Sequence, residues 1–434
     1  MRFKKPRVAG VGPGHCVSPA GARPRARSAK ASIATAMVFA ALLGGRAGPG
    51  ALAQPSPVKV TRELTLPIDV HVRPRPQLVA TDAGQRVMGY QLLITSWAEY
   101  DLTFQRIDIE DAESGAVLAS FDRTALENPA RLRMTRYIMA DASPKNRILP
   151  AGRSAILYVI LPLPAGAAAP KALRHRLIFE PDPKVAVIRD DGSLSSELAI
   201  VSDTIAVDRA PVPVLGPPLE GGPWRCSNGL ALGNSHTYVG TSRTAKMQVA
   251  QLFGCDFQKV DSHGQILRSP FSDPIPWSQF YSYGAKVLAV ADGKVVGLQD
   301  GIPQSTPLVS GKVSMPVPLS NTTVAGNWIA LDIGHGRYAF YAHFQPGSLR
   351  VRLGDHVRTG QVLGLVGMAG NAVNPHLHFH VGNSPSLNGT DGEPYVFRSY
   401  VFEGRSVPDT KVARRVHMRM PVENSIMVFP SGKR

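Results

Sequence analysis

One short stretch, Asn374-Pro375-His376-Leu377-His378-Phe379-His380-Val381, constrains the fold of this chain more than any other. Successive side chains of an extended strand point to opposite faces, so the three histidines share one face and the three apolar residues share the other. The apolar face predicts a strand packed on a core, where neutral imidazoles need polar partners. Two imidazoles on one strand face can approach a single divalent ion, and zinc is the first candidate for nitrogen and oxygen ligands. The stretch therefore predicts a metal or catalytic site, and the competing interpretation is a solvated edge strand that happens to carry histidine.

The length and composition favour a multidomain β protein. The chain has 434 residues, 44% of them hydrophobic, with 41 glycines and 37 prolines, and we expect turn-rich β domains. The formal charge of +16 is uneven, because residues 1–53 hold nine Lys or Arg and no acid. The remainder has 39 basic and 32 acidic residues, a net charge of +7. This diffuse excess comes with no recognised binding motif, so we expect no nucleic-acid partner.

The N-terminus has the features of a secretory signal. A basic leader precedes an apolar run over residues 31–45, and Ala51-Leu52-Ala53 then offers the small residues that a signal peptidase reads. The apolar run is shorter than the roughly 20 residues that cross a bilayer, so no stable membrane span is expected after signal removal. We predict a signal peptide over residues 1–53, a mature protein that begins at Gln54, and export to the periplasm or beyond the cell.

Cysteines are sparse in the predicted mature chain. Cys16 leaves with the signal, and Cys226 and Cys255 remain. The two could form one disulfide in an oxidising compartment or remain two buried thiols. Two cysteines are too few for a cysteine-rich structural zinc site, so such a site is excluded.

The exported chain is predicted to be all-β and to divide at a proline-rich seam. Residues 58–207 alternate in short apolar segments with turn signals between them, which predicts an N-terminal β-sandwich accessory domain. Residues 208–224 carry too many Pro and Gly for a regular element and are interpreted as a linker. We assign residues 225–405 to a second domain and residues 406–434 to an ordered C-terminal extension.

The second domain is where chemistry is expected. The accessory domain contains only His71 and His175, whereas nine of the twelve histidines follow the linker. Strands are predicted over residues 286–296, 328–332 and 337–344. Residues 284–297 and 354–364 resemble each other, as if one β unit were used twice.

The ordered motifs of this region resemble a known family. The stretches YGAKVLAVADGKVV, GNWIALDIGHGRYAFYAHF and VRLGDHVRTGQVLGLVGMAGNAVNPHLHFHV resemble the catalytic core of the lysostaphin-type, or LytM-like, zinc metallopeptidases of bacterial cell walls. The resemblance covers roughly residues 234–400. It implies a duplicated hybrid motif (barrel-sandwich hybrid) and one Zn²⁺ per chain, held by two His and one Asp, with two further His in catalysis.

Carried over to this sequence, the resemblance makes His378 a zinc ligand and His343 and His376 catalytic residues. The other two ligands normally lie four residues apart, but here the candidates His236 and Asp256 are twenty apart. In this respect the chain resembles a subgroup of exported Gram-negative members in which a hairpin separates these ligands.

Alternatives to these ligands stay open in the sequence. Asp256 is favoured over Asp261 because it lies in an apolar, strand-like segment over residues 249–257, where a cation would compensate the carboxylate. His236 is favoured over His263 because it precedes the Asp, as in the family. Three further residues have structural or surface interpretations: Asp332 as a structural carboxylate, and His335 and His356 as solvated turn residues. His380 is assigned either to contact with the site or the substrate, or to the surface.

The resemblance implies an exported peptidase of peptidoglycan, with peptide cross-links, of D,D type, as the expected substrate. Three protein ligands leave a fourth zinc position for water. His376 is placed to take the proton of that water, and His343 to stabilise the oxyanion, although the two roles could be exchanged. The alternative function is a catalytically inactive cell-wall-binding regulator or amidase activator. Loops over residues 300–323 are expected to rim the cleft.

Overall fold

The computed structural model describes residues 66–431, apart from residues 137–138, 142–146, 165, 182–191, 194–196, 239, 243–245, 271, 307–308 and 311. The predicted signal peptide and the start of the mature chain lie outside the described residues. The fold is nearly all-β, as the sequence predicted. Among the described residues, no helix has the length and apolar character needed to cross a membrane.

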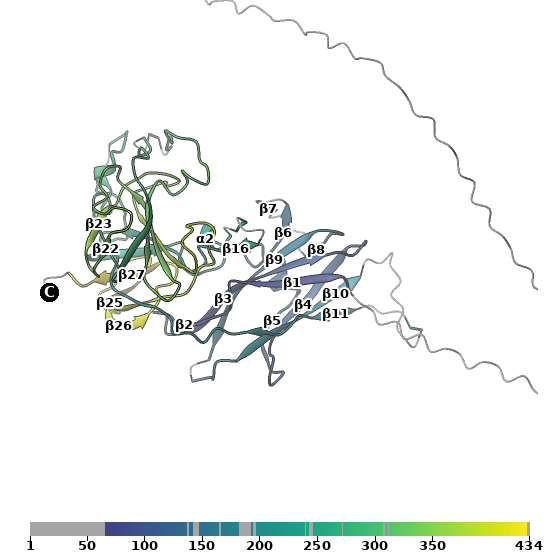
Figure 1. Cartoon of the computed structure of the whole chain (residues 1–434). Coiled ribbons are helices and arrows are strands. Elements are labelled where there is room, and N and C mark those ends of the chain that lie inside the picture. Colours follow the sequence, from purple (N-terminus) through teal and green to yellow (C-terminus); the bar gives the residue numbers. More distant parts are fainter. Residues whose placement is uncertain are drawn as a thin grey trace, which may run out of the picture. The chain divides into compact units, whose positions relative to one another are not determined.

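Two six-stranded sheets, drawn in purple to teal in Figure 1, form the first part of the described chain. The first sheet has the order β1-β3-β9-β6-β7, with β2 paired to β3, and its strands are β1 Ile68–Arg73, β2 Leu78–Ala80, β3 Arg86–Ser96, β6 Leu132–Arg136, β7 Met139–Asp141 and β9 Ser154–Leu163. The second has the order β11-β10-β4-β5, with β8 and β12 at its margins, and its strands are β4 Leu102–Asp111, β5 Val117–Phe121, β8 Ile148–Leu149, β10 Ala172–Pro181, β11 Leu198–Val201 and β12 Ile205–Ala206. Helix α1, Arg123–Glu127, follows β5.

The two sheets pack on a shared apolar core. Alternate residues of β3 face it, including Tyr90, Leu92 and Ile94, and they meet Phe104 and Phe179 of the other sheet. This is the period-two pattern expected of a sandwich, in which one face of each sheet is buried against the other sheet. The β-sandwich predicted for this part of the chain is therefore observed.

An eleven-stranded sheet, teal to yellow in Figure 1, organises the second part of the chain. Its order is β13-β25-β27-β14-β17-β24-β21-β20-β19-β22, with β26 paired to β25. The strands are β13 Val214–Leu215, β14 Gly221–Ser227, β17 Cys255–Lys259, β19 Gly293–Gln299, β20 Asn327–Asp332, β21 Tyr338–Phe344, β22 His356–Val357, β24 Leu377–Gly382, β25 Val396–Arg405, β26 Arg414–Arg419 and β27 Ser425–Phe429. Smaller elements are α2 Ser235–Tyr238, the 3₁₀ turn Trp277–Gln279, and two strand pairs, β15 Thr241–Ser242 with β16 Met247–Gln248 and β18 Lys286–Leu288 with β23 Val362–Leu365.

Two expectations from the sequence are wrong. Residues 208–224 were interpreted as a linker without regular structure, but they contribute β13 and the start of β14 to the sheet. Pro223 is tolerated in β14 because it falls where the pairing with β27 shifts register between Gly221 and Trp224, so no ladder hydrogen bond needs its missing N–H. The strand expected over residues 249–257 begins only at Cys255, because the preceding residues form a turn.

The C-terminal residues 406–434 supply β26 and β27, and β27 lies between β25 and β14 within the sheet. The two similar stretches pair with each other, β18 with β23 and β19 with β22. That they form a repeated unit stays a prediction, as do the domain boundaries.

The core of the large sheet predicts the stability effect of one substitution. Phe379 is fully buried on the apolar face of β24, where its ring lies 5.2 Å from those of Tyr341 and Tyr395. We expect Phe379→Ala to lower the free energy of unfolding by about 3–5 kcal/mol, because it removes the aromatic contacts and leaves a cavity. The exposed residue Leu353 provides the control, since Leu353→Ala should change it by less than about 0.5 kcal/mol. Urea unfolding measures both, and equal effects would contradict the packing described.

Candidate metal centre

The pairing of β17 with β24 brings Asp256 and His378 together. The two residues are direct partners in the antiparallel register, and Nδ1 of His378 lies 2.8 Å from Oδ1 of Asp256. Directly opposed residues of an antiparallel pair have Cβ atoms about 4.5–5.5 Å apart, so the register alone places both side chains within reach of one ion. Both residues are buried, and Leu377 and Phe379 on the other face of β24 fill the core.

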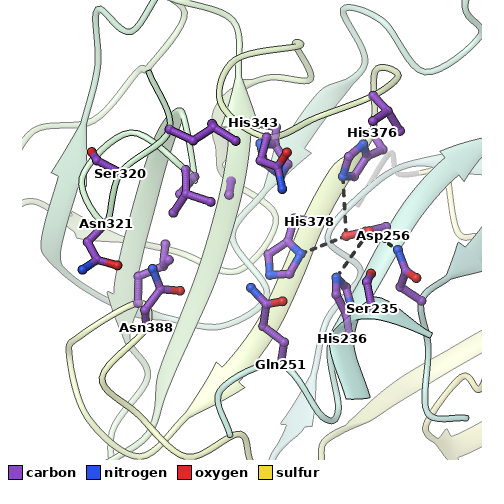
Figure 2. Close-up of a pocket in the computed structure, with 18 residues that line it drawn as sticks. Ser235, His236, Gln251, Asp256, Ser320, Asn321, His343, His376, His378 and Asn388 are labelled. Atoms are coloured by element: carbon purple, nitrogen blue, oxygen red, sulfur yellow. Dashed lines mark hydrogen bonds and ion pairs between the residues drawn. The ribbon is translucent and has the colours of Figure 1, made fainter. Parts of the chain in front are cut away.

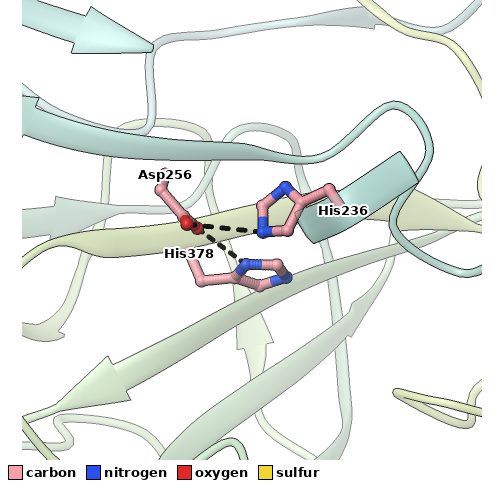
Figure 3. A group of neighbouring side chains, drawn as sticks. All are labelled: His236, Asp256 and His378. Carbon is pink, nitrogen blue, oxygen red and sulfur yellow. Dashed lines mark hydrogen bonds and ion pairs between the residues drawn. The ribbon is translucent and has the colours of Figure 1, made fainter. Parts of the chain in front are cut away.

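Helix α2 supplies His236 to the same place. The helix is a single turn that begins after Asn234, whose Oδ1 accepts the N–H of Thr237 at 3.0 Å, as an N-cap side chain does. Nε2 of His236 lies 3.3 Å from Oδ2 of Asp256, and one donor atom from each of His236, Asp256 and His378 lies within 4.8 Å of the others (Figure 3). The antiparallel strand pair β15 and β16 lies between α2 and β17 in the chain.

A disulfide closes the segment between these candidate ligands. Cys226 and Cys255 are bonded across a sequence separation of 29, and the loop that they close contains α2 and ends beside Asp256. The disulfide decides between the two states of these cysteines that the sequence left open. The disulfide thereby ties the loop that carries His236 to the residue next to Asp256.

The rival residue His263 is not part of this cluster. It is exposed in a turn in which Oδ1 of Asp261 accepts its backbone N–H at 2.8 Å. His335 and His356 are also exposed, and Asp332 accepts the N–H of Gly334 in a turn. The structure brings His236 to Asp256 and leaves these residues apart from it.

The Asp256 carboxylate is buried among imidazoles. Burial raises the pKa of this group, but His236 and His376, together with hydrogen bonds from His236 and His378, outweigh burial and hold the pKa well below its usual range. Burial lowers the pKa of His236, and the Asp256 carboxylate more than offsets it, so the net shift is upward. Asn228 donates from Nδ2 to Oδ2 of Asp256 at 2.8 Å. Asp256 is therefore ionised and fixed in orientation, while burial lowers the pKa of His378 and favours its neutral form.

Two further histidines, His343 and His376, line the same cavity. Nδ1 of His343 lies 2.8 Å from the carbonyl oxygen of Ala369, and Nδ1 of His376 lies 2.8 Å from that of Asn374. A carbonyl oxygen only accepts, so each Nδ1 carries the proton and each Nε2 keeps its lone pair when the ring is neutral. The two rings lie 4.8 Å apart (Figure 2). Both basic nitrogens thus belong to rings oriented by the backbone.

The backbone at His343 is strained. Its φ is +71°, in the left-handed region that side-chain-bearing residues rarely adopt, and its N–H donates to the carbonyl oxygen of Ala325 rather than to the regular ladder of β20. Such a conformation costs on the order of 1 kcal/mol or more and is retained where surrounding structure fixes it. The bend at the end of β21 turns this side chain toward His376.

A cavity of about 780 Å³ opens beside the cluster. Its lining combines His236, Asp256, His343, His376 and His378 with amide, hydroxyl and apolar side chains, and none of the described lining residues is Lys or Arg (Figure 2). Leu319, Ser320 and Asn321 contribute to this lining, so part of the loop region 300–323 lies at the cavity as predicted.

Sequence reasoning did not assign two residues that contact the cluster. Asn228 was not singled out, because an Asn in a turn after a strand carries no sequence signal for a contact with a distant carboxylate. His380 was left between two interpretations, and the structure places it fully buried, with Nδ1 3.0 Å from Nε2 of His378 and its ring stacked on Phe340. The alternation of β24 was the available signal for His380, and its surface interpretation is wrong.

A comparison with protein families identifies the second part of the chain. The family model for peptidase family M23 matches residues 279–389. The chain carries a peptidase family M23 domain. This finding confirms the lysostaphin-type resemblance and the metallopeptidase class. The match includes His343, His376 and His378 but not His236 and Asp256, so the placement of the last two beside the others comes from the structure alone.

Solved structures similar to this chain include three peptidases. The catalytic domain of the prophage-encoded M23 protein EnpA from Enterococcus faecalis is 17% identical, with 42% of this chain and 93% of that chain covered and a TM-score of 0.24. The catalytic domain of lysostaphin from Staphylococcus simulans is 22% identical, with 41% and 86% covered and a TM-score of 0.20. A zinc-containing peptidase from Vibrio cholerae is 14% identical, with 73% and 83% covered and a TM-score of 0.22. At these scores the likenesses add nothing to the family assignment.

The environment of His343 in the M23 domain predicts a pH dependence of stability. Burial, followed by the neighbouring His376 and His378, lowers its pKa from 6.5 to about 3. Between these values the unfolded chain binds a proton that the folded ring does not, so His343 destabilises the fold progressively as the pH falls from 6.5 towards 3. In the metal-free protein, imidazole ¹⁵N shifts should show His343 as the neutral Nδ1–H form throughout pH 5–8.

The control is His343→Gln, which cannot titrate. Its free energy of unfolding should fall less steeply than that of the wild type as the pH is lowered below 6.5. A wild-type His343 signal that titrates above pH 5 would contradict the described environment.

Proposed function

We propose that this protein is an exported zinc metalloendopeptidase that hydrolyses peptide bonds in peptidoglycan, with one zinc ion per chain. The observation that carries the proposal is the convergence of His236, Asp256 and His378 beside a cavity that His343 and His376 also line. The M23 domain supports the activity class. The substrate, the cellular compartment and the roles of individual residues are the proposed part.

The donor set fits a zinc ion. Nε2 of His236, a carboxylate oxygen of Asp256 and Nδ1 of His378 face one another, and two nitrogens with one oxygen are donors that zinc accepts in catalytic sites. The buried carboxylate has no Lys or Arg beside it among the described lining residues, so a cation would compensate its charge. A zinc ion held by these three residues would supply Lewis acidity and lower the pKa of a water molecule to about 7.

His376 is the residue we assign as general base. Its Nδ1–H is held by the carbonyl oxygen of Asn374, which leaves Nε2 as the basic atom, 3.5 Å from Oδ1 of Asp256. From there Nε2 can accept a proton from the attacking water and return it to the leaving amine.

His343 receives a role in the proposal other than the oxyanion stabilisation considered from the sequence. With its pKa lowered to about 3 and its proton at Nδ1, the neutral ring has no N–H at Nε2 to donate to an oxyanion. It can instead accept a hydrogen bond from the attacking water and orient it beside His376. This division of roles is part of the proposal.

The cavity lining supports a peptide substrate of low charge at the scissile bond. Gln251, Asn321 and Asn388 present amides and Ser320 a hydroxyl, groups that hydrogen-bond a peptide backbone, while Leu319 offers apolar contact. We propose peptide cross-links of peptidoglycan, of D,D type, as the substrate, and the predicted signal peptide would deliver the protein to that polymer. The inactive regulator is less well supported, because the chain keeps every residue that the mechanism requires.

Metal content and hydrolysis of sacculi test the proposal together. We expect about one zinc per chain in the mature wild type and its loss in Asp256→Ala and His378→Ala, because each substitution removes a donor. His376→Ala should keep zinc but lose roughly 10²–10⁴-fold in kcat, because it removes proton transfer and no donor. Elemental analysis and muropeptide profiles of digested sacculi provide the measurements.

His356→Ala is the matched control, because this exposed histidine lies outside the cluster, and it should behave as the wild type in both assays. A metal-free wild type that stimulates a separate amidase would establish the regulator instead. Zinc-loaded protein that leaves muropeptides unchanged would contradict the peptidoglycan substrate.

A further inference from the structure

The outward face of the sandwich sheet meets the segment that carries His236. Residues 90, 92 and 94 of β3 point into the sandwich core, so Val87, Gly89 and Gln91 share the opposite face. On the neighbouring strand β9, Tyr158 is the direct partner of Gln91. Gln91 and Tyr158 are each only 2% exposed, although they face away from the sandwich core. Residues of the second part of the chain, among them Thr237 and Tyr238 of α2, therefore cover this face.

We infer that this outward face of β3 and β9 is a structural part of the metal centre, with Gln91 as the positioning residue for His236. The inference rests on the proposed function in so far as His236 is a zinc ligand. It gives the sandwich a role that the sequence did not suggest, because no catalytic or metal-binding residue was expected in that domain.

Gln91 contacts the backbone of the ligand helix itself. Its Nε2 donates to the carbonyl oxygen of Thr237 at 2.7 Å, and Thr237 directly follows His236. The last carbonyl groups of a helix have no partner within it, and α2 is only one turn long, so this bond satisfies a buried acceptor that the helix cannot satisfy. The bond also fixes where the single turn ends relative to β3.

A second contact holds the next residue of α2. The ring of Tyr238 packs edge-on against Tyr158 of β9, with centroids 4.9 Å apart, and the guanidinium carbon of Arg133 in β6 lies 3.4 Å from the centre of the same ring. The positive guanidinium is attracted to the negative face of the ring, so this cation–π contact holds Tyr238 against β6. Three adjacent strands of the sandwich sheet, β3, β9 and β6, thus contact the C-terminal end of α2.

The turn before Asp256 rests on the same face. A Cβ at Gly89 would come within 3.1 Å of the Phe253 ring and 3.2 Å of Leu230, which shows how closely these side chains approach β3. Leu230 precedes α2, and Phe253 precedes Asp256 by three residues. Both belong to one apolar cluster with Val79 and Val87 of the sandwich. The sandwich therefore packs against the segment before His236 and the segment before Asp256, the two candidate ligands outside the M23 match.

The His236 ring itself lies against Gly254, since a Cβ there would come within 3.1 Å of Nδ1. Among the described residues, its other neighbours include Asp256, the His378 ring and the backbone of Asn228. The bond from Gln91 acts instead on the backbone of the helix that carries this ring. A loss of the bond from Gln91 would let the end of α2 shift, and His236 would shift with it. Residues that orient metal ligands change metal affinity by roughly 10–100-fold when they are substituted.

The test is the zinc affinity of the full mature protein, measured by competition with a chelator of known affinity. Gln91→Met keeps the volume of the side chain and removes the donor to Thr237, and it should weaken zinc binding by roughly 10–100-fold. Arg133→Met, at a half-buried position where folding is less at risk, should weaken it in the same direction by a smaller factor. Visible spectra of the Co²⁺-loaded proteins report whether the ligand geometry has changed, independently of hydrolysis.

Thr95→Ala is the matched control. Thr95 lies on the same face of β3 as Gln91, and its side chain bonds Ser154 Oγ of β9 rather than a residue of α2, so the substitution removes a hydrogen bond that does not involve the helix. Its zinc affinity and Co²⁺ spectrum should equal those of the wild type, and thermal unfolding verifies that all variants are folded at the assay temperature. Wild-type affinity in both Gln91→Met and Arg133→Met would overturn the inference and leave the proposed function standing. Failure of the wild type to bind zinc would overturn the proposed function itself.

Discussion

The antiparallel register of β17 and β24 is the constraint on which the site depends. It sets Asp256 against His378 on one face and Phe257 against Leu377 on the other. Because side chains alternate along a strand, a slip of one residue would turn the apolar set outward and the ligands inward. The core residues that hold the register, above all the aromatic cluster around Phe379, therefore also hold the ligand geometry.

Charge is the second constraint, because the register buries a carboxylate. Asp256 is stabilised by imidazoles and by Asn228, and two of these imidazoles are held in turn, His376 by the carbonyl oxygen of Asn374 and His378 by His380. The cluster resembles a metal site in its polar contacts as well as in its donor atoms, since such second contacts orient these rings. The same carbonyl contacts leave the Nε2 atoms of His343 and His376 available for proton transfer or for binding water.

Much of this could be predicted from the sequence, and the missed parts share a cause. The period-two pattern identified β3, β9 and β24, and the motifs identified His343, His376 and His378 together with the M23 domain. The turn before β17 was missed because apolar residues 249–254 pack on the sandwich, and periodicity does not distinguish a buried turn from a strand. The strands within residues 208–224 were missed because Pro223 occupies an irregular position in the ladder, which composition cannot reveal.

By itself, the sequence determined the all-β class, the alternation that puts three histidines on one face, and the chemistry that those residue types can perform. These properties are local, because they follow from the spacing of side chains along one strand. Only the tertiary structure decided that His236 rather than His263 meets Asp256, that the two cysteines are joined, and that Gln91 of the sandwich reaches the end of α2. Each of these depends on contacts between segments far apart in the chain, whose free energy comes from packing and burial that no local pattern encodes.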